Sequence, residues 1–177
     1  MTTIETPRLR LRPHQIGDFA AIHAMLSDPQ VVRHIAPAPP PEEDVWNRLL
    51  RYIGHWQAFG YGIFAVTGRD SGRFLGGAGF ADFHRGLGPD FDRSPEASWV
   101  FAREAQGRGI ASEAATAMHA WFDAQPFGGR SVCIIDPDNA ASRRLAARLG
   151  YVETGEVHYH AAPTLAFERL RGASPRT

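Results

Sequence analysis

Two glycines on either side of one arginine, Gly107-Arg108-Gly109, constrain the fold of this chain more than any other feature of its sequence. They follow residues 96–102, whose pattern is typical of a strand, and they precede residues 110–124, which have helical spacing. A strand that passes so abruptly into a helix leaves the first helical N–H groups without partners. With the helix dipole, such groups favour a bound anion. The turn therefore predicts an anion site or, alternatively, a plain strand-to-helix turn whose glycines relieve crowding.

The side chains of this turn also suit an anion. Gly109 has no Cβ, so the backbone can approach a ligand closely, and Ala111 is small for the same reason. Ser112 adds a hydroxyl donor and Arg108 a charged donor. A P-loop would need a Gly-Lys-Ser/Thr ending, and a dinucleotide-binding turn would need three glycines early in the chain. Neither is present, which disfavours an unrelated ATP- or NAD-binding protein.

The rest of the chain predicts one central sheet and several helices. Strands are expected at residues 6–14, 61–67, 73–82, 96–102, 131–135, 151–160 and 164–170. Helices are expected at residues 18–28, 41–59 and 110–124, and from Asp138 or Asn139 to Gly150. Loops are expected at the proline-rich residues 31–41 and at 83–94. This order predicts an α+β or mixed α/β fold, with one domain over 1–177 and a flexible tail at 172–177.

Composition excludes several classes of function. The 177 residues include 19 Lys plus Arg and 19 Asp plus Glu, so no net charge favours nucleic acid or a charged membrane face. The single cysteine, Cys133, cannot form a disulfide within the chain and fits a reducing cytoplasm. The first residues lack the pattern of a signal peptide, and no apolar stretch could span a bilayer. We therefore expect a cytoplasmic protein that binds neither nucleic acid nor membranes.

Several motifs in a fixed order resemble one known family. Residues 106–111 read Gln-x-x-Gly-x-Ala, residues 6–13 read Thr-Pro-Arg-Leu-Arg-Leu-Arg-Pro, and residues 96–101 read Glu-Ala-Ser-Trp-Val-Phe. Residues 139–142 read Asn-Ala-Ala-Ser, followed by Leu145 and Leu149-Gly150-Tyr151. Together they resemble the GNAT superfamily of acetyltransferases and its RimJ/RimL-like branch of ribosomal-protein N-acetyltransferases. The resemblance implies the GNAT fold, a mostly antiparallel twisted sheet of about seven strands, splayed in the middle, with about four helices.

The resemblance also implies acetyl-CoA as co-substrate and no metal. In this family the pyrophosphate lies on the amides of the turn, here Gln106, Gly107, Arg108, Gly109, Ile110, Ala111 and Ser112. The pantetheine arm pairs with the strand before the turn, here Trp99, Val100 and Phe101. Asn139 is expected at the pantetheine or thioester end with Ser142. The alternative role of Asn139 is a helix N-cap, and one residue can serve both.

The implied reaction is direct attack of a primary amine on the thioester. An alkyl amine has a pKa of about 10, so a group must take up its proton at neutral pH. Glu96, at the start of the strand before the turn, is the expected base, and the alternative is an edge carboxylate in solvent. The N–H of Val100 or Phe101 is expected to polarise the thioester carbonyl.

The family's usual acid, a tyrosine in the last cofactor helix, is replaced here by Ala146. Ser142 matches the serine that RimL-like enzymes are thought to use instead. Its alternative role is a solvent-facing or capping serine in a first helical turn. A thiolate can also leave without an acid, because thiol pKa values are only about 8.5.

The resemblance leaves the acceptor open. It implies a primary amine, either a protein N-terminus or a small molecule, because fold and cofactor loop do not define the acceptor. Residues 33–35, 37–41 and 83–93 are the expected acceptor contacts. The family also allows a homodimer. The alternative function is a non-catalytic acyl-CoA-binding regulatory module, which would bind the cofactor without acetylating an amine.

Overall fold

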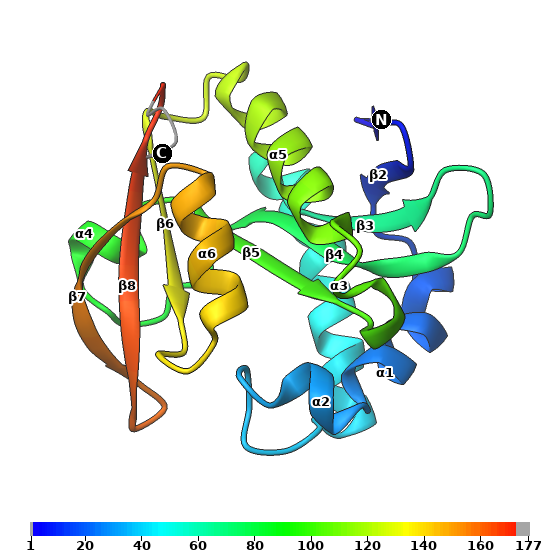
Figure 1. The fold of residues 1–177 in the computed structure, drawn as a ribbon, viewed down its shortest axis with the longest axis horizontal. Coiled ribbons are helices and arrows are strands. Elements are labelled where there is room, and N and C mark those ends of the chain that lie inside the picture. Colours follow the sequence, from blue (N-terminus) through cyan, green and yellow to red (C-terminus); the bar gives the residue numbers. More distant parts are fainter. Residues whose placement is uncertain (1, 173–177) are drawn as a thin grey trace. The chain divides into compact units, whose positions relative to one another are not determined.

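The computed structural model describes residues 2–172, which fall into two compact units (Figure 1). The first unit comprises the described part of Met1–Ala81 together with Ser98–Met118. The second comprises Asp82–Ala97 together with the described part of His119–Thr177. Strand β5 (Glu96–Phe101) and helix α5 (Ile110–Asp123) each contribute residues to both. The expected tail lies, from residue 173 on, outside the described residues.

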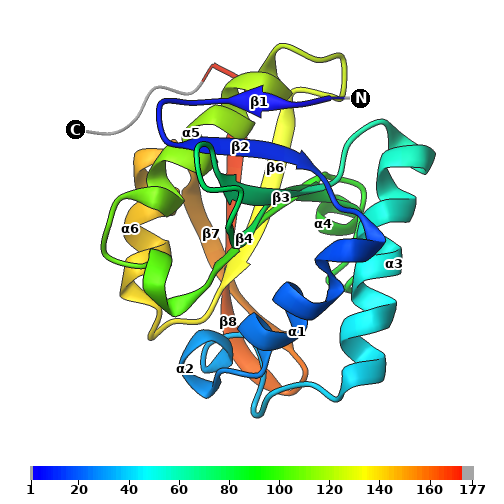
Figure 2. The ribbon, with the colours of Figure 1, turned by 90° about the vertical axis from the view of Figure 1, so that its right-hand side faces the viewer.

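Antiparallel strands form the sheet of the first unit. β1 (Ile4–Glu5), β2 (Leu9–Pro13), β3 (Ile63–Gly68) and β4 (Phe74–Ala81) lie side by side, with β5 next to β4 (Figure 2). Leu11 of β2 lies opposite Val66 of β3. Leu9 and Leu11 are fully buried and Arg10 is exposed, so side chains of this strand alternate between core and solvent, and the strand expected at residues 6–14 is confirmed over Leu9–Pro13.

The helices of the first unit bury one apolar face. They are the 3-10 turns Ile16–Asp18 and Arg103–Ala105, α1 (Phe19–Leu26), α2 (Pro29–Val32), α3 (Glu42–Phe59) and the start of α5. Ile22 and Leu26 of α1 pack with Val45 and Leu49 of α3 in one buried cluster. Burying such a side chain contributes about 1.5–3 kcal/mol. This cluster therefore fixes α1 against α3.

Two one-turn helices replace parts of the expected loops. α2 begins at Pro29, and Oδ1 of Asp28 caps it by accepting a hydrogen bond from the Gln30 N–H, at 2.9 Å. α4 (Pro89–Asp92) also begins at a proline. Proline suits a first helical position because its missing N–H would have no partner there. The expectation of loop at 31–41 and at 83–94 was wrong over these turns, which are too short to show an apolar period.

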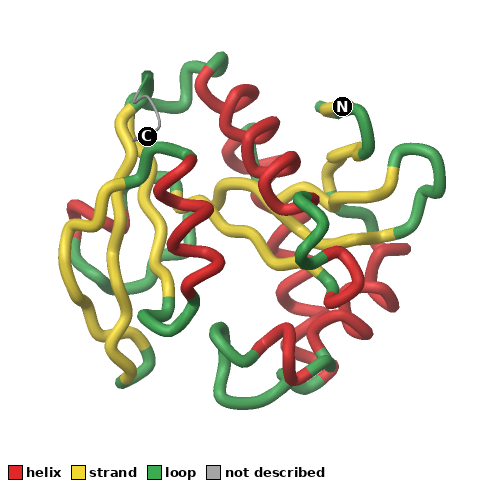
Figure 3. The backbone as a smooth tube through the Cα atoms, in the orientation of Figure 1, coloured by secondary structure: helices red, strands yellow, loops and turns green. Residues whose placement is uncertain are grey.

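The second unit orders its strands differently from their order in the chain. The start of β5 lies beside β6 (Arg130–Ile135), followed by β8 (Ala162–Leu170) and then β7 (Val152–Tyr159) (Figure 3). β5 pairs parallel with β6 at Glu96 and Val132, whereas the other two pairs are antiparallel. α6 (Ala140–Arg148) follows β6 in the chain. β6 is mostly buried, as its apolar sequence predicted, and β7 is an exposed edge strand.

A buried polar network holds the second unit together. The Tyr151 hydroxyl lies 3.0 Å from Nε2 of His119 and 2.9 Å from Oγ of Ser131. Arg169 donates from Nη1 and Nη2 to the two carboxylate oxygens of Asp123, at 2.9 and 2.6 Å. These bonds lower the pKa of Asp123 against the opposing effect of burial, and burial raises the pKa of Tyr151. Satisfied buried polar groups of this kind specify one packing.

The fold class expected from the sequence, mixed α/β with mostly antiparallel strands, is confirmed. The described residues contain eight strands where about seven were expected, because β1 has only two residues and no periodic signal. They contain six α-helices where about four were expected, because of the one-turn helices α2 and α4.

Two glycines of the first unit give a matched test of its packing. A Cβ on Gly79 of β4 would overlap the carbonyl oxygen of Gly62 and lie 2.7 Å from Cα of Ile63, whereas a Cβ on Gly54 of α3 would meet nothing within 4 Å. We expect Gly79→Ala to lower the free energy of unfolding by about 1–3 kcal/mol, because overpacking displaces β3 from β4. Gly54→Ala should raise it by about 0.5–1 kcal/mol through helix propensity. Urea denaturation measures both, and equal stabilities would contradict this packing.

Candidate active site

The turn before α5 has the geometry that its sequence predicted. Gly107 and Gly109 have φ of +70° and +74°, the left-handed region that glycine adopts without strain. The N–H of Glu113 makes the first helical hydrogen bond, to the carbonyl oxygen of Gly109 at 3.0 Å. The amides of residues 110–112 come before that bond. They therefore form the open N-terminal end of α5.

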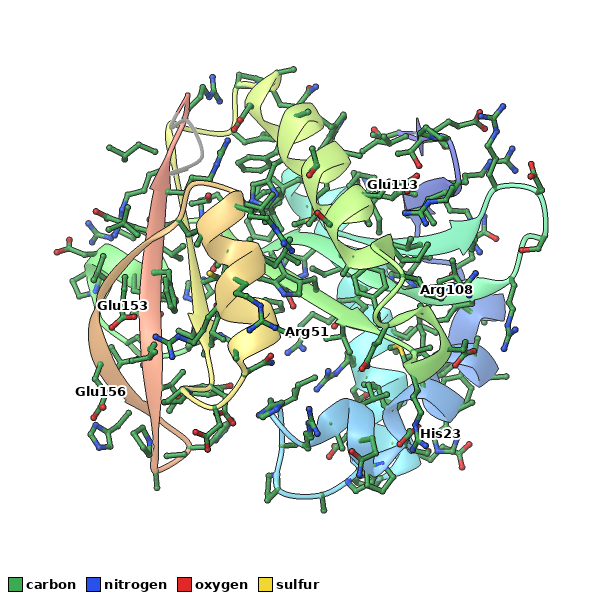
Figure 4. The ribbon with its side chains drawn as sticks, viewed as in Figure 1. His23, Arg51, Arg108, Glu113, Glu153 and Glu156 are labelled. Atoms are coloured by element: carbon green, nitrogen blue, oxygen red, sulfur yellow. The ribbon has the colours of Figure 1, made fainter. Side chains whose placement is uncertain are left out.

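A carboxylate holds this turn in place. Glu113 accepts hydrogen bonds from Oγ1 of Thr6 at 2.6 Å and from the N and Nε atoms of Arg8 at 3.0 and 2.6 Å. Nη1 of Arg8 also donates to the carbonyl oxygen of Arg108, at 2.9 Å. Burial opposes the charge of Glu113, but these bonds outweigh it and lower its pKa, so the group is ionised at neutral pH. Figure 4 shows Glu113 on α5 and Arg108 in the preceding turn.

Two guanidinium groups flank the open end of α5. A Cβ at Gly109 would lie 3.4 Å from Nη2 of Arg8, so this cation is close to the turn. Arg108 is exposed and donates from Nη1 to the carbonyl oxygen of Glu104, at 3.3 Å. Free helical amides, the helix dipole and two cations all favour a phosphate group.

Strand β5, which leads into this turn, lies close to β4. A Cβ at Gly76 of β4 would overlap the carbonyl oxygen of Val100, so only glycine permits this approach. Nε2 of Gln106 donates to the carbonyl oxygen of Phe101, at 3.0 Å, and so ties the turn to the end of the strand. Trp99 and Val100 are half-buried and Phe101 is buried. The expected pantetheine-binding segment thus lies beside β4, directly before the turn.

Glu96, the expected base, is buried in the second unit. It is 4% exposed, and its two carboxylate oxygens accept hydrogen bonds from Nε and Nη2 of Arg85, both at 2.6 Å. The guanidinium carbon of Arg85 lies 4.6 Å from the ring centroid of Phe83 and 4.7 Å from that of Tyr159. The alternative of an edge carboxylate in solvent is therefore wrong. A carboxylate is stable in such a place only with a paired charge, which Arg85 supplies.

This ion pair limits what Glu96 can do. Burial alone would lower the pKa of Arg85, but the hydrogen bonds and charge of Glu96 outweigh it and raise that pKa. A carboxylate in a bidentate, charge-assisted pair holds protons weakly. Glu96 can therefore orient an ammonium group or a water molecule more readily than it can store a proton. Burial, and then the charge of Glu96, raise the pKa of Cys133, so that thiol is protonated and belongs to the core, as expected.

Asn139 and Ser142 lie at the start of α6 in the second unit. Oδ1 of Asn139 accepts a hydrogen bond from the Ser142 N–H, at 3.1 Å, so its expected role as N-cap is confirmed. Ser142 is half-buried in the first turn. Ala146, where the family has a tyrosine, is fully buried. The cofactor contacts of Asn139 and Ser142 stay predictions.

Sequence reasoning missed Arg8, Glu113, Arg85 and Tyr159. The sequence does contain a signal for Glu113, because an acidic side chain in the first turn of a helix often accepts hydrogen bonds from nearby donors. Arg85 falls within the segment expected to contact the acceptor, but no spacing rule links it to its carboxylate. Among residues 2–172, no group of three His, Cys, Asp or Glu side chains is placed to hold a metal ion.

The fold and the turn define a class of enzyme. Residues 8–152 match the family model described as an acetyltransferase (GNAT) domain, so the chain belongs to the GNAT family and is an acyltransferase. A putative GNAT-family acetyltransferase from Bordetella pertussis is 34% identical, with a TM-score of 0.85 over 96% of this chain and 99% of that one. The uncharacterized protein YkkB of Bacillus subtilis (strain 168) is 26% identical over 174 residues, 95% of each chain.

A more distant structure shares the fold alone. It is an acetyltransferase from Salmonella typhimurium that modifies the N-terminal serine of the 50S ribosomal protein L7/L12. It is 16% identical, with a TM-score of 0.77 over 96% of this chain and 99% of that one. The expected RimJ/RimL-like branch stays a prediction. Within residues 2–172, every helix is too short or too polar to cross a membrane.

Breaking the buried ion pair should cost far more stability than breaking an exposed one. Arg85→Met leaves the Glu96 charge uncompensated, and we expect a loss of about 3–5 kcal/mol in the free energy of unfolding at neutral pH. Arg73→Met is the control, because Arg73 pairs with Glu104 at 2.7 Å on the surface and should contribute at most about 1 kcal/mol. The difference in lost unfolding free energy between Arg85→Met and Arg73→Met should be smaller at acidic pH, because a protonated Glu96 needs no cation beside it. Similar small losses in urea denaturation would show that Glu96 does not depend on Arg85.

Proposed function

We propose that this protein transfers the acetyl group of acetyl-CoA to a primary amine by direct attack. One observation carries the proposal, the open end of α5 after two left-handed glycines, flanked by Arg8 and Arg108. This arrangement supplies amides, a dipole and positive charge for a pyrophosphate. The thioester of acetyl-CoA supplies the activated acyl group. All other roles fall to residues of this chain.

The cofactor roles divide between the turn and the strand before it. The amides of residues 106–112 bind the pyrophosphate, and Arg8 and Arg108 balance its charge, so no metal is needed. Glu113 keeps Arg8 in place. The backbone of residues 99–101 pairs with the pantetheine arm. Asn139 and Ser142 contribute contacts of their own.

The catalytic roles concern one proton and one developing negative charge. Glu96, ionised by its pairing with Arg85, orients the acceptor ammonium or a water that carries its proton away. The N–H of Val100 or Phe101 stabilises the oxyanion that develops on the thioester oxygen. Ser142 protonates the departing thiolate. That last role contributes least, because a thiolate is already a good leaving group.

The acceptor we propose is a primary amine, either a protein N-terminus or a small molecule. The fold shared with the Salmonella enzyme makes the first class worth testing. Peptides with N-terminal serine or alanine, spermidine and several amino acids form a suitable panel, followed by mass spectrometry. We propose further that residues 1–177 act as one catalytic domain in the cytoplasm and that the protein forms homodimers.

A specific observation favours one second candidate, a non-catalytic acyl-CoA-binding module. Arg85 occupies both oxygens of the expected base, Glu96. Such a module would bind acetyl-CoA and acetylate no member of the amine panel. Turnover of any amine at a rate proportional to enzyme concentration would exclude it.

Changing Gly109 tests the cofactor turn directly. We expect Gly109→Glu to weaken acetyl-CoA binding at least 10-fold, because the new carboxylate lies where phosphate should bind. Gly72→Glu is a matched control, since Gly72 also has positive φ (+65° against +74°) and open space around it, but lies in the β3–β4 turn. Calorimetric titration with acetyl-CoA, and with ATP as a competing anion, measures both. Equal affinities in the two variants would place the cofactor elsewhere.

Changing the proposed catalytic groups should separate turnover from binding. We expect Glu96→Gln to lower kcat about 100-fold with little change in acetyl-CoA affinity, because a neutral amide cannot attract the ammonium or its proton. Ser142→Ala should lower kcat less than about 10-fold. Glu168→Gln is the control, a carboxylate of the same unit paired with Arg130 at 3.0 Å. Unchanged kcat for Glu96→Gln with an accepted amine would remove Glu96 from the mechanism.

A further inference from the structure

A small cavity lies inside the first unit, between helices α1 and α3 and strands β3, β4 and β5. Its walls include His14, Arg48, Tyr52, Ser98 and Val100. The volume of this cavity is about 10 Å³. That is room for a single water molecule, provided that polar groups hold it there.

His14 brings an unsatisfied polar atom to this cavity. The residue is 4% exposed, and neither ring nitrogen has a hydrogen-bond partner among the described residues. Nδ1 lies 3.5 Å from Oδ2 of Asp18, whereas Nε2 has no hydrogen-bond partner within residues 2–172. Tyr52 stacks on the ring with centroids 5.2 Å apart and so fixes its plane. A buried nitrogen of this kind needs a partner, and the cavity has room for one water.

Asp18 determines where the imidazole carries its proton. Its carboxylate accepts hydrogen bonds from Nη1 and Nη2 of Arg12, at 2.8 and 2.6 Å, and from the Gln15 N–H at 2.8 Å. Burial opposes its charge, but these bonds and the neighbouring His14 outweigh it and lower the pKa of Asp18 far below its usual range. An ionised carboxylate beside Nδ1 favours the tautomer with hydrogen on Nδ1. Nε2 then carries the lone pair, and a Cβ built on Gly77, which also lines the cavity, would lie 3.6 Å from it.

Several charged or titratable groups surround this histidine. Arg12 of β2 and Asp18 of the adjoining 3-10 turn lie on one side, and Arg48 and Tyr52 of α3 line the same cavity. Of these groups, the Asp18 carboxylate lies beside the ring, with Oδ2 3.5 Å from Nδ1.

We propose that Nε2 of His14 holds one water in this cavity and through it accepts the proton that the acceptor amine releases. This inference rests on the proposed function and names a second, positioning residue for it. The amine nitrogen forms a bond to the thioester carbon, the carbon–sulfur bond breaks, and sulfur leaves with the electron pair and takes up one proton. The ammonium thus yields one net proton, which passes through the water to His14. Ser98 and Val100 connect the cavity to β5, whose residues 99–101 carry the proposed pantetheine contacts.

The tautomer of His14 is measurable without any acceptor. Nitrogen NMR of the uniformly ¹⁵N-labelled full chain, with His14→Asn to assign the ring signals, reports which nitrogen carries hydrogen. We expect hydrogen on Nδ1 and a hydrogen-bonded lone pair on Nε2 at neutral pH. Hydrogen on Nε2, or a ring that never takes up a second proton down to the pH at which the protein unfolds, would overturn the proposal.

The pH dependence of turnover tests the proton transfer. With the best amine of the panel, kcat/KM of the unchanged enzyme should fall in acid, and His14→Asn should lower it about 100-fold and remove that acidic limb. Asn keeps a donor toward Asp18 and loses only the Nε2 position. His55→Asn is the matched control, another buried histidine of the first unit, whose Nδ1 contacts the Arg51 carbonyl oxygen at 2.8 Å.

The outcomes distinguish this inference from the proposed function. If His14→Asn has a lower melting temperature but its kcat/KM still falls in acid, the water is structural and the inference fails. If His14→Asn does not fold, His14→Gln replaces it, and a retained limb in that variant has the same meaning. If the unchanged protein does not bind acetyl-CoA in calorimetry, the proposed function fails, and this inference, which rests on it, fails with it.

Discussion

The carboxylate of Glu113 is the interaction on which the geometry of the cofactor turn depends. Glycines at positive φ permit a tight turn, but they also give the unfolded chain more freedom to lose on folding. Thr6 and Arg8 fasten the first turn of α5 to the connection between β1 and β2, more than a hundred residues earlier in the chain. An anion site held in this way loses less entropy on binding than a flexible glycine loop would. Arg8 both holds the turn in place and lies next to it as a cation, so it would link the stability of the turn to the phosphate binding that we propose for it.

The same kind of contact recurs wherever charge is buried. Arg12 with Asp18, Arg85 with Glu96, and Arg169 with Asp123 each pair two guanidinium nitrogens with two carboxylate oxygens. All 19 basic residues of the chain are arginines, and the planar guanidinium matches a carboxylate in a way that a lysine ammonium does not. The total charge is therefore neutral, although opposite charges are paired inside the protein. The neutral composition gave no electrostatic reason to expect a polyanion such as nucleic acid as partner, but it did not show where the charges meet.

Local pattern predicted the regular elements well and the contacts between them poorly. The bounds of α3, Glu42–Phe59, follow from its acidic first turn and its apolar spacing. The Gly-Arg-Gly turn could be predicted because the residues that define it are adjacent in the sequence. β1, α2 and α4 were missed because two to four residues carry no period. The partners of Glu113 and Glu96 were missed for another reason. An ion pair between distant segments depends on tertiary packing, so the sequence predicted a base or, alternatively, an edge carboxylate at Glu96 and did not indicate its buried pair with Arg85.

In the mechanism that we propose, the carboxylates of Glu96 and Asp18 have different effects on proton transfer. A proton placed on Glu96 would break a buried ion pair and leave the Arg85 charge without its partner, so the energy of that pair opposes protonation. The ionised carboxylate of Asp18 lies 3.5 Å from Nδ1 of His14 and favours hydrogen on that nitrogen, which leaves Nε2 as the acceptor. A carboxylate bound by arginine is therefore suited to orient a substrate cation. An imidazole beside a carboxylate is suited to take up a proton, and a chain that has both can divide orientation and proton transfer between two residues.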